Sequence, residues 1–352
     1  MLPHLGRAEL QAWVMPEDEF NAVCSLLAHV EIVLQDKRGE QPLPAYGACL
    51  LGAINLTKLI NRPFEKCASM DLMALRELTG TAVRMLDNVI DISRYPIDQQ
   101  REEAVSKRRI GLGITGLADA LIMCGVRYGS EEAVNLTKNW LRVLRDSAYR
   151  CSIDLAKEKG SFPLFVKEKF IENHNVKKLS KDLRAGIYSY GIRNALLTSI
   201  APTGTISLLA NNVSSGLEPV FAFKYNRKVL QSDGSSFIEP VSDYALALFE
   251  ELKGQGENKT QAFVDAQTLQ PNDHLVMQAA VQEYIDSSIS KTINCPENIE
   301  FETFKAVYKS AYDLGCKGCT TYRPNAITGS VLSIDKLSLI LISEPTRPLY
   351  IS

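Results

Sequence analysis

The chain has 352 residues, about twice the usual length of one domain, so two ordinary domains or one large α/β domain are both open. Hydrophobic residues make up 45% and charged residues 23%, which is typical of a soluble globular protein and argues against disorder, collagen-like repeats and a coiled coil. With 39 Lys and Arg against 41 Asp and Glu, the formal net charge is -2, so no overall basic charge indicates nucleic acid or an anionic membrane as a partner.

No segment of the sequence reads as a membrane span or a secretion signal. The longest apolar runs, such as residues 48–56 and 337–342, are far shorter than the roughly 20 residues that cross a bilayer. His4, Arg7 and Glu9 interrupt the stretch where a signal peptide needs continuous hydrophobicity. Eight irregularly spaced cysteines do not form the framework of a disulfide-rich secreted protein. We therefore expect a cytoplasmic protein whose cysteines are mostly reduced.

The first predicted elements follow an unassigned amino-terminal stretch, residues 1–38. Residues 41–44 contain two prolines and read as a loop, and the apolar run 48–56 is suited to a buried strand or a short core element. Apolar residues at helical spacing then predict a helix over residues 72–90 that ends near Pro96.

The strongest predicted helix runs from residue 130 to about residue 159. Ser130 is its expected N-cap, and Gly160 follows its last turn. Alternation of long helices with strand-like runs implies α/β layering in a single domain. The remaining expected elements are helices at 242–253 and 297–314 and strands at 195–200, 206–209 and 220–223.

Residues 111–116 fit the G-x-G-x-x-G pattern of dinucleotide-binding proteins. That fingerprint needs a buried strand before its first glycine, and residues 102–109 are too charged for one. We therefore favour glycines that allow close backbone packing, and we rank an NAD-dependent oxidoreductase last among the function hypotheses.

A second glycine motif is a better candidate for binding an anion. A glycine between hydroxyl residues lets backbone N–H groups converge on phosphate oxygens while the threonines add O–H donors. From these residues alone, an ordinary Pro-Thr-Gly turn that caps a helix is slightly favoured. The motif consists of Pro202, Thr203, Gly204, Thr205 and Ile206.

Cys316 and Cys319 form an isolated C-x-x-C pair. Zinc would need two further ligands, and the four histidines have no ligand spacing, so no metal site is expected. A redox dithiol remains open, but core cysteines are the favoured interpretation. Taken alone, these residues indicate at best a nucleotide-binding α/β protein.

Longer blocks of sequence resemble the large catalytic subunit of ribonucleotide reductases, specifically the adenosylcobalamin-dependent class II enzymes. The blocks keep the family order and are residues 39–56, 109–119, 201–207, 214–219, 288–297 and 315–324. We accordingly divide the chain into an unassigned segment 1–38, a carboxy-terminal reductase barrel domain 39–332 and an unassigned tail 333–352.

The resemblance implies part of the ten-stranded α/β barrel of this family, with the amino-terminal strands absent. It implies that Cys49 is one of two thiols that reduce the substrate and that Glu40 is the carboxylate of the central loop. It further implies that Gly39 and Glu40 contact the substrate, and that the motif at residues 202–206 holds its phosphates.

The implied reaction converts ribonucleotides to deoxyribonucleotides for DNA synthesis. A thiyl radical removes the 3′ hydrogen of the ribose, a carboxylate takes the 3′-hydroxyl proton, and two thiols reduce the 2′ carbon while forming a disulfide. Adenosylcobalamin supplies the first radical through its cobalt–carbon bond. The implied partners are a ribonucleoside di- or triphosphate and a thioredoxin- or glutaredoxin-type reductant, and the resemblance allows a homodimer.

The chain departs from the family pattern where the radical cysteine is expected. Arg38 occupies that position and Asp36 occupies the position of the family's asparagine, and a guanidinium cannot carry a thiyl radical. We expect a chain that is truncated or shifted in reading frame and inactive alone. The alternative is a non-catalytic, nucleotide-binding remnant or a partner of a full-length reductase.

Overall fold

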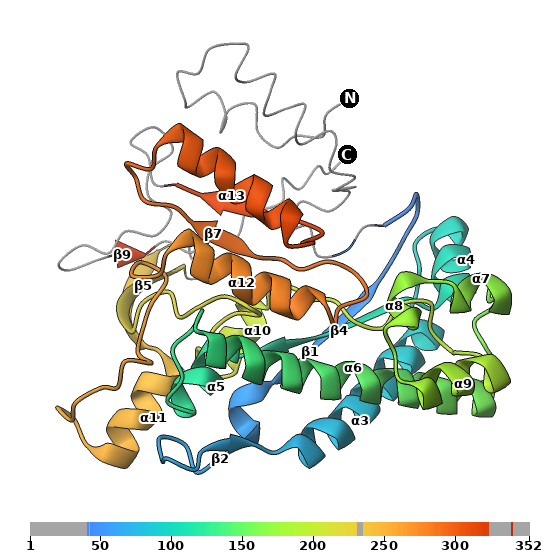
Figure 1. The fold of residues 1–352 in the computed structure, drawn as a ribbon, viewed down its shortest axis with the longest axis horizontal. Coiled ribbons are helices and arrows are strands. Elements are labelled where there is room, and N and C mark those ends of the chain that lie inside the picture. The colour runs from blue at the N-terminus through green and yellow to red at the C-terminus, as the bar shows by residue number, and fades with distance from the viewer. Residues whose placement is uncertain (1–40, 42, 231–234, 324–338, 341–352) are drawn as a thin grey trace.

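The computed structural model describes residues 41, 43–230, 235–323 and 339–340 (Figure 1). Its strands are β1 (Leu50–Asn55), β2 (Ile60–Asn61), β3 (Ser69–Met70), β4 (Ile110–Thr115), β5 (Lys224–Leu230), β6 (Ser236–Ser242), β7 (Thr292–Asn294), β8 (Thr320–Tyr322) and β9 (Leu339–Ile340). Its helices are the 3₁₀ turn η1 (Leu56–Leu59) and α3 (Leu72–Ile92), α4 (Asp98–Lys107), α5 (Leu117–Met123), α6 (Glu131–Lys159), α7 (Lys167–Ile171), α8 (His174–Lys177), α9 (Lys181–Tyr190), α10 (Gly204–Leu209), α11 (Tyr244–Lys253), α12 (Pro271–Gln282) and α13 (Phe301–Asp313).

Parallel strand segments succeed one another across the molecule. β1 pairs with β4 in parallel, and α3 and α4 form the crossover that such a pair requires. Residues 196–200 run along the other edge of β4, and the segment that leads into β7 bridges to Ile200. β7 then pairs in parallel with β8. This succession confirms the α/β prediction, whereas the ten-strand barrel and the division at residues 38 and 332 stay predictions.

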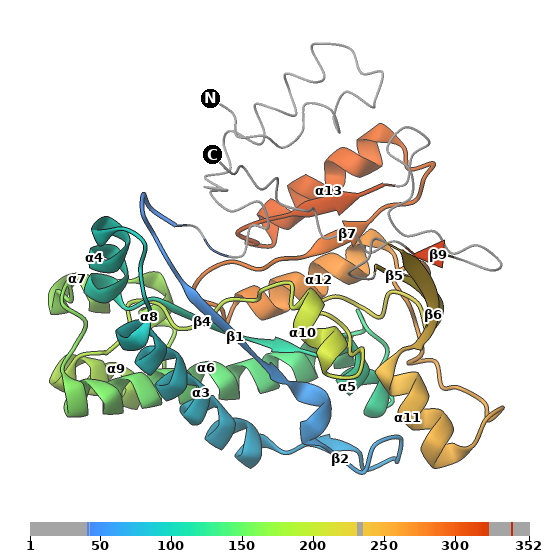
Figure 2. The ribbon, with the colours of Figure 1, turned by 180° about the vertical axis from the view of Figure 1, so that it is seen from behind.

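The long helix α6 lies over one face of these strand segments. Figures 1 and 2 show α6 between α3 and α12, on the helical side of β1 and β4, and α6 packs against both helices. Ser130 caps it by accepting a hydrogen bond from the N–H of Ala133, and Gly160 follows it with φ +82°. The predicted limits of this helix are therefore confirmed.

Gly111 and Gly113 lie inside β4, where every residue is buried. A Cβ atom at Gly113 would lie 2.3 Å from the carbonyl oxygen of Ser199, and one at Gly111 would lie 2.6 Å from Leu51 Cδ2. Only glycine lets the neighbouring segments approach this closely. The interpretation as packing glycines is confirmed, because a dinucleotide fingerprint would place them in a turn after the strand.

The strand expected at residues 206–209 is wrong, because these residues belong to α10. Helical hydrogen bonds form from the N–H of Ser207 to the oxygen of Thr203 (2.8 Å) and from Ala210 to Ile206 (3.0 Å). A short apolar run has no periodicity that separates a strand from a helix, so the tertiary environment decided its conformation. The expected strands at 195–200 and 220–223 contribute only isolated bridges, at Thr198, Ile200 and Val220.

A buried network of charges ties the start of β4 to α3. The Arg108 guanidinium donates to Asp87 Oδ1 (2.8 Å), to the carbonyl oxygen of Asp87 (2.9 Å) and to Asp91 (2.7 Å). Asn194 donates to Asp87 Oδ1 (3.0 Å) and to the oxygen of Arg108 (3.0 Å). Since Asp87 has no exposed side-chain surface, its charge depends on these partners.

Asp87→Ala should therefore lower the free energy of unfolding by about 3–5 kcal/mol, because it leaves the Arg108 charge buried without its fully buried partner. Asp91→Ala is the matched control, since the Asp91 side chain is 47% exposed and water can replace it. Urea denaturation measures both. Equal losses in the two variants would contradict the assignment of Asp87 as the centre of the network.

Candidate functional site

Cys49, which the sequence predicts to be one of two reducing thiols, lies among the described residues. It immediately precedes β1, is half-buried, and its Sγ lies 3.4 Å from the place where a Cβ atom of Gly111 would stand. The thiol therefore lies beside the first residues of β4. The other residues predicted around it lie outside the described residues: Asp36, Arg38, Gly39 and Glu40.

The motif at residues 202–206 forms the entry to α10. Thr203 has φ +57° and ψ +20°, a left-handed conformation that a β-branched residue rarely adopts. Gly204, Thr205 and Ile206 follow it in the first turn of the helix and are exposed. The first N–H groups of a helix have no partner within the helix, so this turn presents backbone donors.

Hydrogen bonds within the protein occupy the hydroxyl group of Thr203. Gly216 N–H donates to Thr203 Oγ1 (2.7 Å), and the hydroxyls of Thr203 and Thr115 lie 2.9 Å apart. Thr115 gives its own proton to the carbonyl oxygen of Ser214 (3.0 Å), so the proton of Thr203 goes to Thr115. Thr203 therefore shapes the loop, and the exposed residues of the motif are 204–206.

Cys49 and the 202–206 loop lie at opposite ends of one strand. Cys49 is beside Gly111, near the start of β4, and Thr203 is bonded to Thr115, its last residue. Four residues along a strand correspond to about 13 Å. The two predicted parts of the site are thus joined by β4, and their access to one shared cavity stays a prediction.

A tight turn at residues 215–218 supports the loop. The Glu218 N–H donates to the carbonyl oxygen of Ser215 (2.8 Å) and closes the turn. Gly216 has φ +52°, and a Cβ atom there would lie 2.7 Å from the oxygen of Ala201. Glycine is therefore required for the Gly216 N–H to reach Thr203.

Two buried carboxyl groups lie behind this turn. Asp119 accepts hydrogen bonds from the N–H groups of Ser214 (2.5 Å) and Ala245 (3.0 Å). Asp243 caps α11 by accepting from the N–H of Leu246 (3.1 Å), and its side chain is hydrogen-bonded to Asp119. Burial, together with the charge of Asp119, raises the pKa of Asp243 well above its usual value, so Asp243 holds the proton of the pair.

A buried lysine lies on the other side of the turn. Lys291 Nζ donates to Glu218 Oε2 (2.6 Å), to His274 Nδ1 (2.8 Å) and to the carbonyl oxygen of Thr292. Burial lowers the pKa of His274 to about 2, so its ring is neutral and accepts through Nδ1. The sequence interpretation did not single out these residues, although Asp119, Glu218 and Lys291 fall within the family-like blocks, whose buried charges are the signal that could have found them.

The C-x-x-C cysteines have the environment of core residues. Cys316 is buried in a hydrophobic cluster with Ile293, Phe304 and Val307. Burial raises the pKa of Cys316 to about 11 and, with the charges of neighbouring thiols, that of Cys319 to about 12. Thiols of this kind are poor nucleophiles, so the interpretation as core cysteines is favoured.

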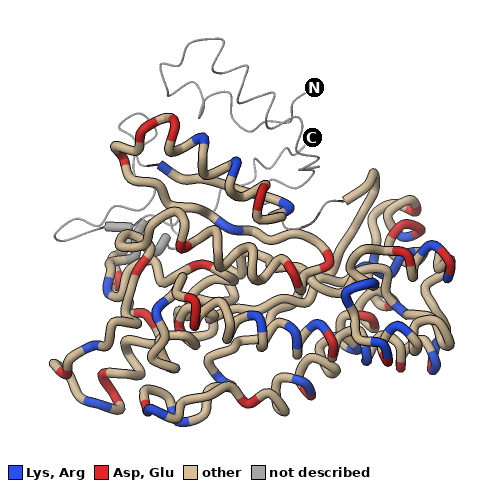
Figure 3. The backbone as a smooth tube through the Cα atoms, in the orientation of Figure 1, with Lys and Arg blue, Asp and Glu red and all other residues tan. Residues whose placement is uncertain are grey.

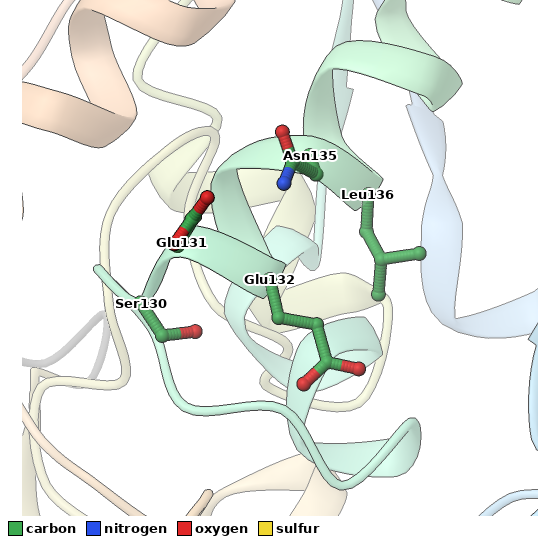
Figure 4. A pocket seen from close by; sticks show the side chains of 5 residues that line it. All are labelled: Ser130, Glu131, Glu132, Asn135 and Leu136. Carbon is green, nitrogen blue, oxygen red and sulfur yellow. The ribbon is translucent and has the colours of Figure 1, made fainter.

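The surface adds little that resembles a binding site. Figure 3 shows Lys and Arg interspersed with Asp and Glu along the outer helices. The hollow in Figure 4 is lined by the first turns of α6 and includes the side chains of Glu131 and Glu132. Their negative charges would repel a phosphate. Within the described ranges, no cluster of three or more His, Cys, Asp or Glu side chains could hold a metal ion. No helix among these residues combines the length and apolar character needed to cross a membrane.

The carboxyl pair predicts a loss of stability as the pH rises above about 4, the ordinary pKa of a carboxyl group. A group whose pKa is raised in the folded state contributes stability at low pH that is lost as the pH rises through the folded-state pKa. Asp243→Asn keeps an acceptor for Leu246 and gives Asp119 a permanent donor, so its urea midpoint should decline less than that of the wild type as the pH is raised. A steeper decline in this variant would contradict the shared proton.

Asp119→Asn is the comparison for that experiment. Its amide would place an N–H group against a backbone N–H of Ser214 or Ala245, which should cost about 1–3 kcal/mol at every pH. A variant as stable as the wild type would mean that Asp119 does not hold the turn.

The raised thiol pKa values predict a labelling order. Cys67 is exposed, whereas Cys295, Cys316 and Cys319 each have a pKa raised to about 11 or 12. Iodoacetamide at pH 8 should therefore modify Cys67 first and reach these three only after unfolding, because the thiolate is the reactive form. Peptide mass spectrometry of the native protein checks the order, and early labelling of Cys319 would favour the redox dithiol instead.

Comparisons with known proteins agree with this architecture. The family model described as "Ribonucleotide reductase, barrel domain" matches residues 12–322, so the match begins before the boundary expected at residue 39. The "Vitamin B12-dependent ribonucleoside-diphosphate reductase" of Mycobacterium tuberculosis (strain CDC 1551 / Oshkosh) is 37% identical over 314 residues, which are 84% of this chain and 42% of that protein.

Two further relatives extend the comparison. The protein of the same name from Thermoplasma acidophilum is 35% identical over 84% of this chain and 38% of its own length. The "Ribonucleoside-diphosphate reductase subunit alpha" of Buchnera aphidicola is 29% identical over the same shares. The chain thus spans about two fifths of the length of these curated relatives. From the family match over most of its residues, the chain belongs to the ribonucleotide reductase family and carries the barrel domain of that family.

Proposed function

We propose that the chain binds a ribonucleotide for vitamin B12-dependent reduction to the 2′-deoxyribonucleotide. The observation that carries the proposal is the 202–206 loop, whose left-handed Thr203 leads into three exposed residues, 204–206, at the end of β4. Relatives at 35–37% identity are named ribonucleoside-diphosphate reductases, which favours a diphosphate over a triphosphate substrate.

The proposed roles are assigned to the two ends of β4, the 202–206 loop at one end and Cys49 at the other. The N–H groups of Gly204, Thr205 and Ile206 would bind the phosphates, and Pro202 and Thr203 would hold their loop in place. At the other end of the strand, Cys49 would face the ribose as one of two reducing thiols. The ribose of a nucleotide carries the phosphates on its 5′ carbon, so the sugar would lie on the Cys49 side of the phosphates.

The carboxylate and the reductant complete the proposal. Glu40, with Gly39 beside it, would take the proton of the 3′ hydroxyl group. Cys49 and a second thiol would give two electrons and two protons, so that the 2′ hydroxyl group leaves as water, hydrogen replaces it on the 2′ carbon and the thiols form a disulfide. A thioredoxin- or glutaredoxin-type protein would reduce that disulfide again. A homodimer stays a proposal on the family resemblance alone.

Adenosylcobalamin is the cofactor that the names of the relatives favour, and when bound it would supply the first radical. Whether this chain could use the cofactor depends on a thiol, because the first radical must be passed to a cysteine. The family position of this thiol is Arg38, with Asp36 beside it, and a guanidinium cannot form a thiyl radical. The residues of this chain do not fit radical transfer, and we derive no step through the cofactor.

Arg38 favours a second candidate function, nucleotide binding without turnover. In this role the chain would keep the phosphate loop and act as a remnant or as a partner of a full-length reductase. The two candidates share the binding step and differ in the formation of deoxynucleotide. Product formation from cytidine diphosphate with adenosylcobalamin and a dithiol would decide for the first, and binding without product for the second.

Calorimetry with cytidine diphosphate should detect binding, and with cytidine it should detect much less. Gly204→Asp should weaken binding of the diphosphate at least about tenfold, because a carboxylate at the loop repels the phosphates. Gly80→Asp adds the same charge on α3, where a side chain meets nothing within 4 Å, and should leave the affinity unchanged. Equal affinity in the wild type and Gly204→Asp would overturn the assignment of the loop.

A further inference from the structure

Lys291 is the most deeply buried cation in the described part of the chain that has no role in the proposed reaction. Its side chain has 0% exposure. An ammonium group has three donors, and all three find acceptors: Glu218, His274 and the carbonyl oxygen of Thr292. Burying a charge is costly unless its partners are in place, so this arrangement requires an explanation.

The carboxylate of Glu218 connects this lysine to the turn at residues 215–218. Glu218 Oε2 accepts from Lys291 Nζ (2.6 Å), and Glu218 Oε1 accepts from the N–H of Thr292 (2.6 Å) at the start of β7. Both carboxylate oxygens are thus held by two consecutive residues, Lys291 just before β7 and Thr292 at its start. The Tyr128 hydroxyl donates to the carbonyl oxygen of Leu217 (2.7 Å) and holds the turn from another side.

The same turn contacts the phosphate loop at two points. Gly216 N–H donates to Thr203 Oγ1 (2.7 Å), and the hydroxyls of Ser215 and Ser207 lie 2.9 Å apart. Thr203 depends on such contacts, because its left-handed backbone is unfavourable for a β-branched residue. A continuous set of hydrogen bonds therefore runs from Lys291 to the entry of α10.

We infer that Lys291 is a positioning residue for the substrate, which holds the phosphate loop in its binding conformation through Glu218 and Gly216. The inference rests on the proposed nucleotide binding. Lys291 does not itself contact the nucleotide. Its contribution is to keep the turn at residues 215–218 closed, so that the Gly216 N–H stays directed at Thr203.

Loss of the lysine charge should loosen the loop at alkaline pH. The titratable groups that face Lys291 are Glu218 in the turn, His274 on α12 and Cys319 before β8. Burial lowers the pKa of Lys291 from its usual 10.5, and the charge of Glu218 opposes part of that effect. The nucleotide phosphates are already ionised above pH 8, so they do not titrate in the same range.

The first test is calorimetry with cytidine diphosphate from pH 7 to pH 10. Lys291→Met should bind about tenfold more weakly at pH 7.5, a factor that corresponds to about 1.4 kcal/mol. Wild-type affinity should fall toward pH 10, and this fall should be absent in Lys291→Met. Glu218→Gln, which keeps the shape of the side chain, should show the same weakening and serves if Lys291→Met does not fold.

Lys317→Met is the matched control, because Lys317 lies in the neighbouring segment and donates to the carbonyl oxygen of Asp286 instead (2.6 Å). It should leave both affinity and pH profile unchanged. Wild-type affinity in both Lys291→Met and Glu218→Gln, or an equal loss in Lys317→Met, would overturn the inference.

Amide hydrogen exchange without any nucleotide separates this inference from the proposed function. Exchange over residues 203–216 should be faster in Lys291→Met and Glu218→Gln than in the wild type, and unchanged in Lys317→Met. If the wild type binds no nucleotide but the exchange pattern holds, the proposed function fails and the positioning role stands. Unchanged exchange in both variants overturns the positioning role.

Discussion

The left-handed backbone of Thr203 is the constraint on which the candidate site depends. A β-branched residue at φ +57° costs on the order of 1–3 kcal/mol, and it persists only where the surroundings hold it. Here the hydroxyl of Thr115 and the N–H of Gly216 hold it. Strained residues of this kind cluster at functional sites.

Buried charges occur at the ends of strands. Asp87 and Arg108 join α3 to the start of β4, Asp119 and Asp243 hold the turn beyond its end, and Lys291, just before β7, reaches that turn. Each group satisfies its hydrogen bonds within the protein, as low-dielectric surroundings require. Such contacts are directional, so they position loops more closely than apolar packing does.

The family relationship and the departure at Arg38 concern different parts of the reaction. The barrel domain, Cys49 beside β4 and the loop at its other end are what binding and reduction of a ribose would use. Under the proposed correspondence with the family, Arg38 would stand where the thiol that receives the initiating radical is expected. Binding and initiation would then depend on separate residues, so one could persist where the other is lost.

The sequence by itself determined the helices α3 and α6 and the reductase family, because periodicity, caps and extended motifs are local signals that survive without a structure. It left residues 48–56 open between a strand and a short core element, and the structure places β1 there. It also indicated why Gly111 and Gly113 are glycines. Only the tertiary structure decided that residues 204–209 are helical and that the Thr203 hydroxyl group forms a hydrogen bond with Thr115. It alone brought Lys291 to Glu218, 73 residues away in the chain. Contacts across such separations depend on how strands stack, which no local pattern records.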